Sequence, residues 1–565
     1  MKKTLKFVSG FLCVSLLLGS TTAFACTGAY VGKDVSADGS TIIARSEDIS
    51  PSDYDKLHYV VPGVANKKGQ VMTDINGIQV ALPDTTYQYT TMSDYKTAGD
   101  GLYAAVCTNV NGVSVTGTVS ASPCKQWKEA DPTVKAGLRE AILPAYVAAT
   151  SKTAKEGVTN MLSAVDTYGS AEGNILMVAD QNEAWLVELY GGHQYAAMKM
   201  PADKVAVFGN QFMIETVDPT DTENYIFSKD LFATIDKLGL AVKENGKYHL
   251  AKSICDKTRS DNSNMRTWVG HQVLAPSTAG DYKTETFYPL FYKPDGKVAL
   301  QDVMGIYRNR FEGTKYDMTV AGNEKMRPIA VSTTPETHIV QLFSDMPAAA
   351  SSVTWLAMGG GEHSVFLPEF GGISDVAPAY KVDSKTYSPD SLYWAFKSVC
   401  GLADTNRTLY KGVGDFYAIE EAQMIKKMAA EQKTVKNLYA ADPVKGAAYT
   451  TALAKTMAEE QMANAQGLYA DLLTVLTHNA GLSATKTPTT FVADTALRDA
   501  AAGKGYAVTW NGADQTITLK KGAASYTLTL GSKTCKTAGE DLKLTHAPYT
   551  KNGTTYAPVD FIMGL

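Results

Sequence analysis

The stretch CTGAYVGKDVSADGSTIIARSED, which runs from Cys26 to Asp48, decides the fold of this chain. An apolar run after Cys26 leads to Asp38-Gly39, a dipeptide typical of tight turns, and residues 41–45 form a second strand-like run. This pattern predicts a β-hairpin. Because the strands of a hairpin return to the same end, we expect Arg45 and Asp48 to lie beside Cys26.

Residues 1–25 have the pattern of a secretory signal peptide. Three lysines among the first six residues precede an apolar run over residues 7–19, and Ala23-Phe24-Ala25 places small residues at the cleavage site. The apolar run is shorter than the roughly 20 residues that a membrane-spanning helix needs. We therefore expect an exported protein, secreted or associated with the cell envelope, whose mature chain begins at Cys26.

Composition excludes several classes of protein. The chain has 565 residues, 45% of them hydrophobic and 20% charged, which indicates a globular protein with more than one folding unit. A net charge of -5 gives no basic excess for binding nucleic acid. The sequence shows no His-Glu-x-x-His, Cys-x-x-Cys or phosphate-loop pattern. We expect neither a metal nor a cofactor.

Three interpretations of Cys26 remain open on these grounds alone. The residue could carry a lipid anchor, although Ala23 stands where lipoprotein signals usually have Leu. It could form a disulfide, and Cys107 and Cys124 could also bridge each other or be buried thiols. A free N-terminal Cys can instead act as a nucleophile, because its own α-amine can take the thiol proton.

Several segments together resemble peptidase family C69, a family of N-terminal nucleophile hydrolases related to penicillin V acylases and bile salt hydrolases. The resemblance covers about residues 26–400 and departs from the family pattern at Val110, where Glu is usual, and at Arg310, where His is usual. The segments that carry it are Cys26-Thr27, Arg45–Asp48, Asn109–Val113, Gly117–Ser120, Val207–Asn210 and Arg308–Thr314.

The resemblance implies an α+β fold, the αββα sandwich, with the nucleophile at the start of a central strand. It also implies a role for each matched residue. Cys26 is the nucleophile and its α-amine the base, Asp48 orients that amine, and Arg45 lowers the pKa of the thiol. Asn109 and Asn210 match positions that stabilise the oxyanion, and a second arginine is either Arg308 or Arg327.

The resemblance and the hydrophobic pattern also divide the chain into domains. The hydrolase domain covers residues 26–484, with predicted helices over 134–147, 153–163 and, rich in Ala, Glu, Lys and Met, 419–478. After a linker at residues 485–490, residues 491–565 resemble the small β-rich copper amine oxidase N-terminal-like domain. A lone His546 there implies no copper, and we expect this domain to mediate attachment to the cell envelope.

The resulting functional hypothesis is an exported cysteine dipeptidase that hydrolyses dipeptides or short peptides. The partner is then a small peptide substrate, and the helices favour a homo-oligomer. Two alternatives stay open: an N-acyl amide hydrolase acting on a bile salt or penicillin V, and a lipid-anchored binding protein without enzymatic activity. Substrate pockets are built from loops that vary within one fold, so the sequence does not choose between substrates.

Overall fold

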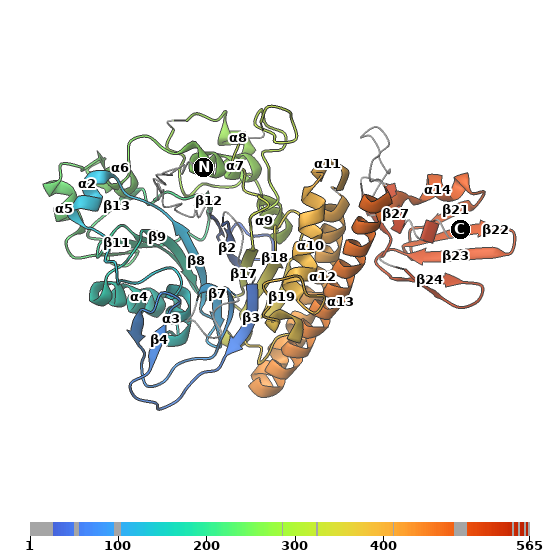
Figure 1. Cartoon of the computed structure of the whole chain (residues 1–565), viewed down its shortest axis with the longest axis horizontal. Coiled ribbons are helices and arrows are strands. Elements are labelled where there is room, and N and C mark those ends of the chain that lie inside the picture. Colours follow the sequence, from blue (N-terminus) through green and yellow to red (C-terminus); the bar gives the residue numbers. More distant parts are fainter. Residues whose placement is uncertain are drawn as a thin grey trace, which may run out of the picture.

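Two antiparallel sheets lie face to face in the computed structural model (Figure 1). The structure describes residues 26–49, 56–94, 103–284, 286–323, 326–410, 412–478, 494–544, 547–551, 554–558, 561–562 and 565. The predicted signal peptide and the linker at residues 485–490 therefore lie outside the described residues. Within the described part of the chain, no helix is long and apolar enough to cross a membrane.

The first sheet has six strands and contains the predicted hairpin. Its strands, in spatial order, are β12 (Val205–Phe208), β1 (Thr27–Val31), β2 (Thr41–Glu47), β17 (Glu336–Leu342), β18 (Ser352–Met358) and β19 (Leu367–Phe370). β1 and β2 pair with Gly28 opposite Arg45. Gly39 in the connecting turn has φ +78°, a conformation that glycine adopts without strain.

The second sheet has eight strands. Its strands, in spatial order, are β14 (Tyr225–Phe227), β11 (Tyr195–Lys199), β10 (Ala184–Leu189), β9 (Asn174–Ala179), β8 (Ser114–Ser120), β7 (Ala104–Asn109), β6 (Tyr89–Asp94) and β3 (Lys56–Val61). Side chains alternate between its faces: Ile175 and Met177 pack into the core between the sheets, whereas Leu176 and Val178 pack into an outer core. The sheet is therefore covered on both sides.

Helices complete the sandwich. α3 (Leu143–Thr150) and α4 (Ala154–Tyr168) contact the outer face of the eight-stranded sheet. The six-stranded sheet is covered by α7 (Asp261–Leu274), α10 (Leu392–Asp404), α12 (Gly412–Ala441) and α13 (Pro443–His478). The architecture is thus the expected αββα sandwich, and the predicted helical segment is a pair of long helices that turns at Asp442.

Short elements connect these layers. They are β4 (Val71–Thr73), β5 (Gln79–Ala81), α2 (Lys125–Ala130), β13 (Thr216–Val217), α5 (Leu231–Lys237), β15 (Lys243–Glu244), β16 (Lys247–His249), α6 (Leu250–Ile254), α8 (Pro276–Ala279), α9 (Leu300–Ile306), α11 (Arg407–Tyr410) and the 3-10 turns Ala348–Ala350 and Pro378–Lys381.

A small β-rich domain follows beyond α13, at one end of the molecule (Figure 1). One of its sheets has five strands: β21 (Ala507–Asn511), β22 (Thr516–Lys521), β23 (Ala524–Thr529), β24 (Thr534–Thr537) and β25 (Leu542–Lys543). The other has β20 (Asp494–Ala496), β26 (Tyr549–Lys551) and β27 (Thr554–Pro558), and α14 (Leu497–Gly503) packs beside them. This domain has an apolar core of its own, which includes Leu519 and Leu528.

Two expectations differ from the structure. The helix predicted over residues 134–147 begins only at Leu143, because the backbone N–H groups of Val134 and Leu138 donate to the carbonyls of Ser170 and Gly169. Those N–H groups are thus bonded outside a helix. The suggested bridge between Cys107 and Cys124 is also absent, since every cysteine from Cys26 onward is a free thiol.

Candidate active site

Cys26 stands directly before β1, at the edge of the core between the sheets, and is fully buried. Its Sγ atom accepts a hydrogen bond from Nη2 of Arg45 at 3.2 Å. Burial raises the pKa of the Cys26 thiol from 9.0 to about 11, while the Arg45 guanidinium acts in the opposite direction. The hairpin thus brings the thiol and its cation together, but with this pKa the thiol is protonated at neutral pH.

A buried charge network fixes Arg45 from the side away from the thiol. Nη1 of Arg45 lies 3.5 Å from Glu47 and 3.4 Å from Glu336, on the neighbouring strand β17. Lys56 then pairs with Glu47 at 2.8 Å and with Asp94 at 2.5 Å. Because buried ions are stable only when they are paired, these contacts hold the guanidinium in one position.

Asp48 lies at the end of the hairpin, as the sequence predicts. Its backbone N–H acts to lower the pKa of the Cys26 thiol. Its carboxylate pairs with Nη2 of Arg327 at 2.8 Å and accepts a hydrogen bond from Thr334 at 2.5 Å. Of the two arginines that the family resemblance suggested, Arg327 therefore reaches this site.

Arg266 is a site residue that the sequence analysis missed. It projects from α7 and is fully buried, and Nη1 donates to the Cys26 carbonyl at 2.5 Å and to Thr27 Oγ1 at 3.0 Å. Nη2 donates to Oδ1 of Asn210 at 2.7 Å. Burial, reinforced by the charge of Arg327, lowers the pKa of Arg266 to about 9. Arg266 thus ties Cys26 to Asn210.

Asn210 follows β12 and completes the cluster. Its Nδ2 donates to the Ser120 carbonyl at 2.9 Å, and its Oδ1 is occupied by Arg266. A side-chain amide has two hydrogens, so Nδ2 can also donate to a ligand. Asn210 and Ser120 both line a cavity of about 570 Å³ that Glu172 and Tyr190 also border. The amide is positioned to hydrogen bond a molecule in that cavity.

The structure does not bring Asn109 to the nucleophile. Its side-chain amide donates to the carbonyls of Ala148 and Ser151, at 2.8 and 2.7 Å, and its Oδ1 accepts from the backbone N–H groups of Asn111 and Val113. The residue closes the turn between β7 and β8 and ties that turn to the end of α3. Its polar atoms thus stabilise the fold through these hydrogen bonds.

Arg308 is likewise engaged elsewhere. Its guanidinium forms two hydrogen bonds, 2.7 and 2.9 Å long, with the carboxylate of Glu421 on α12. It also donates to the carbonyls of Gly361 and Ser364. These contacts anchor a covering helix to the loop after β18.

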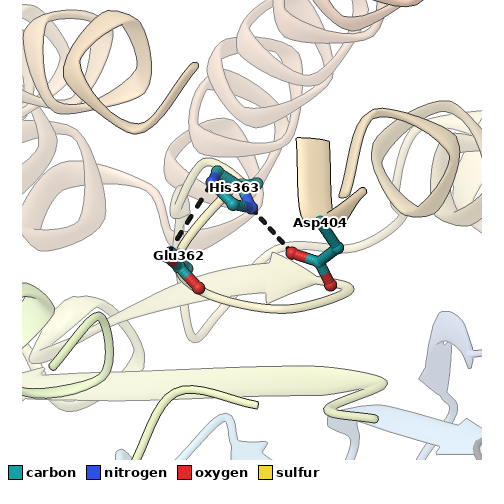
Figure 2. A group of neighbouring side chains, drawn as sticks. All are labelled: Glu362, His363 and Asp404. Carbon is teal, nitrogen blue, oxygen red and sulfur yellow. Dashed lines mark hydrogen bonds and ion pairs between the residues drawn. The ribbon is translucent and has the colours of Figure 1, made fainter. Parts of the chain in front are cut away.

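One group of side chains has the composition of a metal site. Glu362, His363 and Asp404 approach one another in Figure 2, with His363 Nδ1 2.9 Å from Asp404. Arg407 pairs with both acids, at 2.9 Å from Glu362 and 2.7 Å from Asp404. Since guanidinium and imidazole already satisfy these carboxylates, the arrangement is that of an ion-pair cluster and does not fit a metal ion.

The fold and site together define a class of enzyme. A cysteine at the start of a central strand of an αββα sandwich, with an arginine against its sulfur, is the arrangement of N-terminal nucleophile hydrolases. The chain belongs to one of their families: residues 25–419 match the model of peptidase family C69. Residues 489–564 match the copper amine oxidase N-terminal domain.

The chain is also similar to several probable dipeptidases. A "Probable dipeptidase B" of Streptococcus pyogenes serotype M1 is 34% identical over 75% of this chain and 87% of the relative. A "Probable dipeptidase" of Salmonella dublin is 31% identical over 67% of this chain and 87% of the relative. Among solved structures, a mutant of the conjugated bile acid hydrolase from Clostridium perfringens is 12% identical, with a TM-score of 0.30, over 61% of this chain and 92% of that chain.

Proposed function

We propose that this peptidase is an exported cysteine dipeptidase whose nucleophile is Cys26. The observation that carries the proposal is the buried Cys26 thiol at the start of β1, with Arg45 Nη2 3.2 Å from its sulfur. The names of the similar dipeptidases and the start of the family match at residue 25 support it.

Removal of the signal peptide activates the nucleophile. In the uncleaved chain the Cys26 nitrogen is part of a peptide bond and cannot accept a proton. Cleavage before Cys26 converts it into an α-amine with an ordinary pKa of about 8. The neutral amine takes the thiol proton, and Arg45 stabilises the thiolate that remains.

The reaction then proceeds in two halves. The Cys26 thiolate attacks the scissile carbonyl carbon, and the resulting oxyanion accepts a hydrogen bond from Nδ2 of Asn210. The Cys26 ammonium returns its proton to the leaving nitrogen, so the C–N bond breaks and a thioester remains. Water, deprotonated by the same amine, hydrolyses the thioester and restores the thiol.

The remaining site residues position these groups. Asp48 favours the thiolate through its backbone N–H, and Arg327 and Thr334 fix the Asp48 carboxylate. Arg266 fixes the carbonyl of Cys26 and the orientation of the Asn210 amide. Catalysis therefore depends on side chains that are far apart in the sequence but meet around Cys26.

N-terminal sequencing and mass spectrometry of the exported protein test this proposal. We expect the mature chain to begin at Cys26 with a free amine, and Cys26→Ala to abolish hydrolysis of dipeptides. A diacylglyceryl thioether on Cys26 would instead indicate a lipid-anchored protein. Full activity of Cys26→Ala would refute the mechanism, and preferential cleavage of N-acyl amides would refute the dipeptide assignment.

A further inference from the structure

Two cavities adjoin the catalytic centre and share one residue. The larger, about 570 Å³, is reached through Asn210, which Arg266 links to Cys26. The smaller, about 240 Å³, is lined by Ile49, the residue after Asp48. Glu172 lines both. One cavity is thus lined by Asn210 of the site and the other by the residue that follows Asp48, an arrangement that suits a substrate extending to either side of the scissile bond.

The smaller cavity has an acidic wall. Three carboxylates, Asp94, Glu140 and Glu172, line it together with one cation, Arg139. Lys56 pairs with Asp94, the Tyr103 hydroxyl donates a hydrogen bond to Glu140, and Arg139 lies 3.8 Å from Glu172, so the three carboxylates outnumber the cations that contact them. The charge on this wall is therefore complementary to a cationic group.

Glu140 and Glu172 form a connected pair beside the nucleophile. The backbone N–H of Glu140 donates to Glu172 Oε1 at 2.7 Å, and Ser120 Oγ lies 3.5 Å from Glu140 Oε2. Ser120 is the residue whose carbonyl accepts the hydrogen bond from Asn210. The negative charge of Glu140 acts on both the Cys26 thiol and Arg45. Glu140 is thus linked to the site through Ser120 and through its charge, and Glu172 is linked to the site through Glu140.

We propose that the smaller cavity is the subsite for the free N-terminal ammonium group of the substrate, with Glu140 and Glu172 as its counter-ions. The inference rests on the proposed function and states which peptides the site selects. In a dipeptide the ammonium nitrogen is two bonds from the scissile carbonyl carbon, so its subsite must adjoin the nucleophile. A charge-assisted hydrogen bond to a carboxylate is the strong form of such recognition.

The titration of Glu172 agrees with this assignment. Burial, followed by the charge of Glu140, raises the pKa of Glu172 to about 7. A bound ammonium group would favour the ionised carboxylate, because an opposite charge at short range lowers the pKa of an acid. A cationic substrate group would therefore favour the ionised form of both acids.

A pair of substrates that differ only at this group tests the proposal. Alanyl-leucine carries the ammonium, and propionyl-leucine has hydrogen in its place. For the full-length mature enzyme we expect kcat/KM to be at least about 30-fold higher for alanyl-leucine, because a site built for a polar group discriminates strongly against its absence. In Glu140→Gln/Glu172→Gln the ratio should fall to within about 3-fold, mainly through a higher KM for alanyl-leucine.

Glu129→Gln provides the matched control. Glu129 lies on α2 with its side chain 66% exposed, and the change also removes one negative charge. This variant should keep the wild-type ratio of kcat/KM for alanyl-leucine to kcat/KM for propionyl-leucine. Glu172→Asp, which keeps a carboxylate, should retain part of that ratio. Equal cleavage of both compounds by the wild-type enzyme overturns the subsite even if the double variant fails to fold. Cleavage of neither overturns the proposed function, and the subsite with it.

Discussion

Arg266 joins three parts of the site and is the residue whose loss we expect to be most severe. It contacts the Cys26 carbonyl, Thr27 and Asn210 through two nitrogens of one guanidinium. Arg266→Lys keeps a cation but lacks the planar fork, so it cannot hold Cys26 and Asn210 together. We expect kcat to fall about 100-fold in Arg266→Lys.

Arg266→Ala should also destabilise the fold, by about 3 kcal/mol, because buried polar partners lose their donor. Steady-state kinetics and urea denaturation measure the two effects separately. Wild-type kcat in Arg266→Lys would show that the guanidinium fork is not needed to position the nucleophile.

Asn210 and Asn109 should separate catalysis from stability. We expect Asn210→Ala to lower kcat about 100-fold, the typical effect of losing an oxyanion donor. Asn109→Ala should leave kcat nearly unchanged but destabilise the protein by about 3 kcal/mol, because four backbone groups, three of them in buried residues, each lose a hydrogen bond. Kinetics and thermal unfolding of both variants check this. A stable Asn109→Ala enzyme with low kcat would instead show that Asn109 takes part in catalysis.

Distance along the chain explains which site residues the sequence could predict. Cys26, Arg45 and Asp48 belong to one hairpin, whose turn residues and strand pattern can be recognised in a short stretch of sequence. Arg266 arrives from α7, which is buried on nearly every side although half of its residues are polar, so no amphipathic pattern marks it. Asn109 fits a family motif, but packing against α3 directs its amide away from Cys26.

Gly117 shows how a strand of one sheet controls a residue of the other. An added Cβ at this position of β8 would lie 2.3 Å from the Ala105 carbonyl oxygen and 2.9 Å from Nη1 of Arg45. Both distances are too short for the atoms to stay in place. We expect Gly117→Ala to displace the guanidinium from the thiol and to lower kcat at least about 10-fold.

Gly305→Ala is the control for this prediction. Gly305 lies on α9, and nothing is within 4 Å of an added Cβ there. The control should keep wild-type kcat and gain up to about 1 kcal/mol of stability from helix propensity. Steady-state kinetics of both variants test this prediction. An unchanged kcat in Gly117→Ala would mean that Arg45 adjusts its position without losing its function.

Elements with a clear hydrophobic period could be predicted, and elements defined by long-range contacts could not. The helix predicted over residues 153–163 is observed as α4, in which the buried residues Val158, Met161, Leu162 and Val165 recur at helical spacing. Residues 134–142 have helical composition, but hydrogen bonds to Gly169 and Ser170 hold them as an irregular connection with turns. Tertiary pairing overrides local preference there.

The whole molecule combines a hydrolase body with a small domain that has a separate core. Lys533 connects them, 3.2 Å from Asn464 and 3.8 Å from Glu420. We propose that residues 491–565 attach the enzyme to the cell envelope. A chain ending at residue 484 should keep wild-type kcat/KM but be released from cell-wall fractions that retain the full-length protein. Equal retention of both chains would contradict this role.

Alkaline pH should destabilise the entire fold through its buried thiols. Burial raises the pKa values of Cys107, Cys255 and Cys400 from 9.0 to about 12. Between pH 9 and 12 the folded state keeps these protons while the unfolded chain loses them, so stability falls as pH rises. Each thiol contributes about 1.4 kcal/mol per pH unit in that range.

Urea denaturation under reducing conditions, at about pH 8 and about pH 10.5, measures this decline. Cys107→Ala removes one titrating group, and its free energy of unfolding should fall by about 2 kcal/mol less than that of the wild type over this interval. Val115→Ala is the control, because Val115 is the cross-strand partner of Cys107, is equally buried and does not titrate. It should lower stability equally at both pH values. If Cys107→Ala and Val115→Ala lose stability in parallel with the wild type, another group governs the alkaline transition.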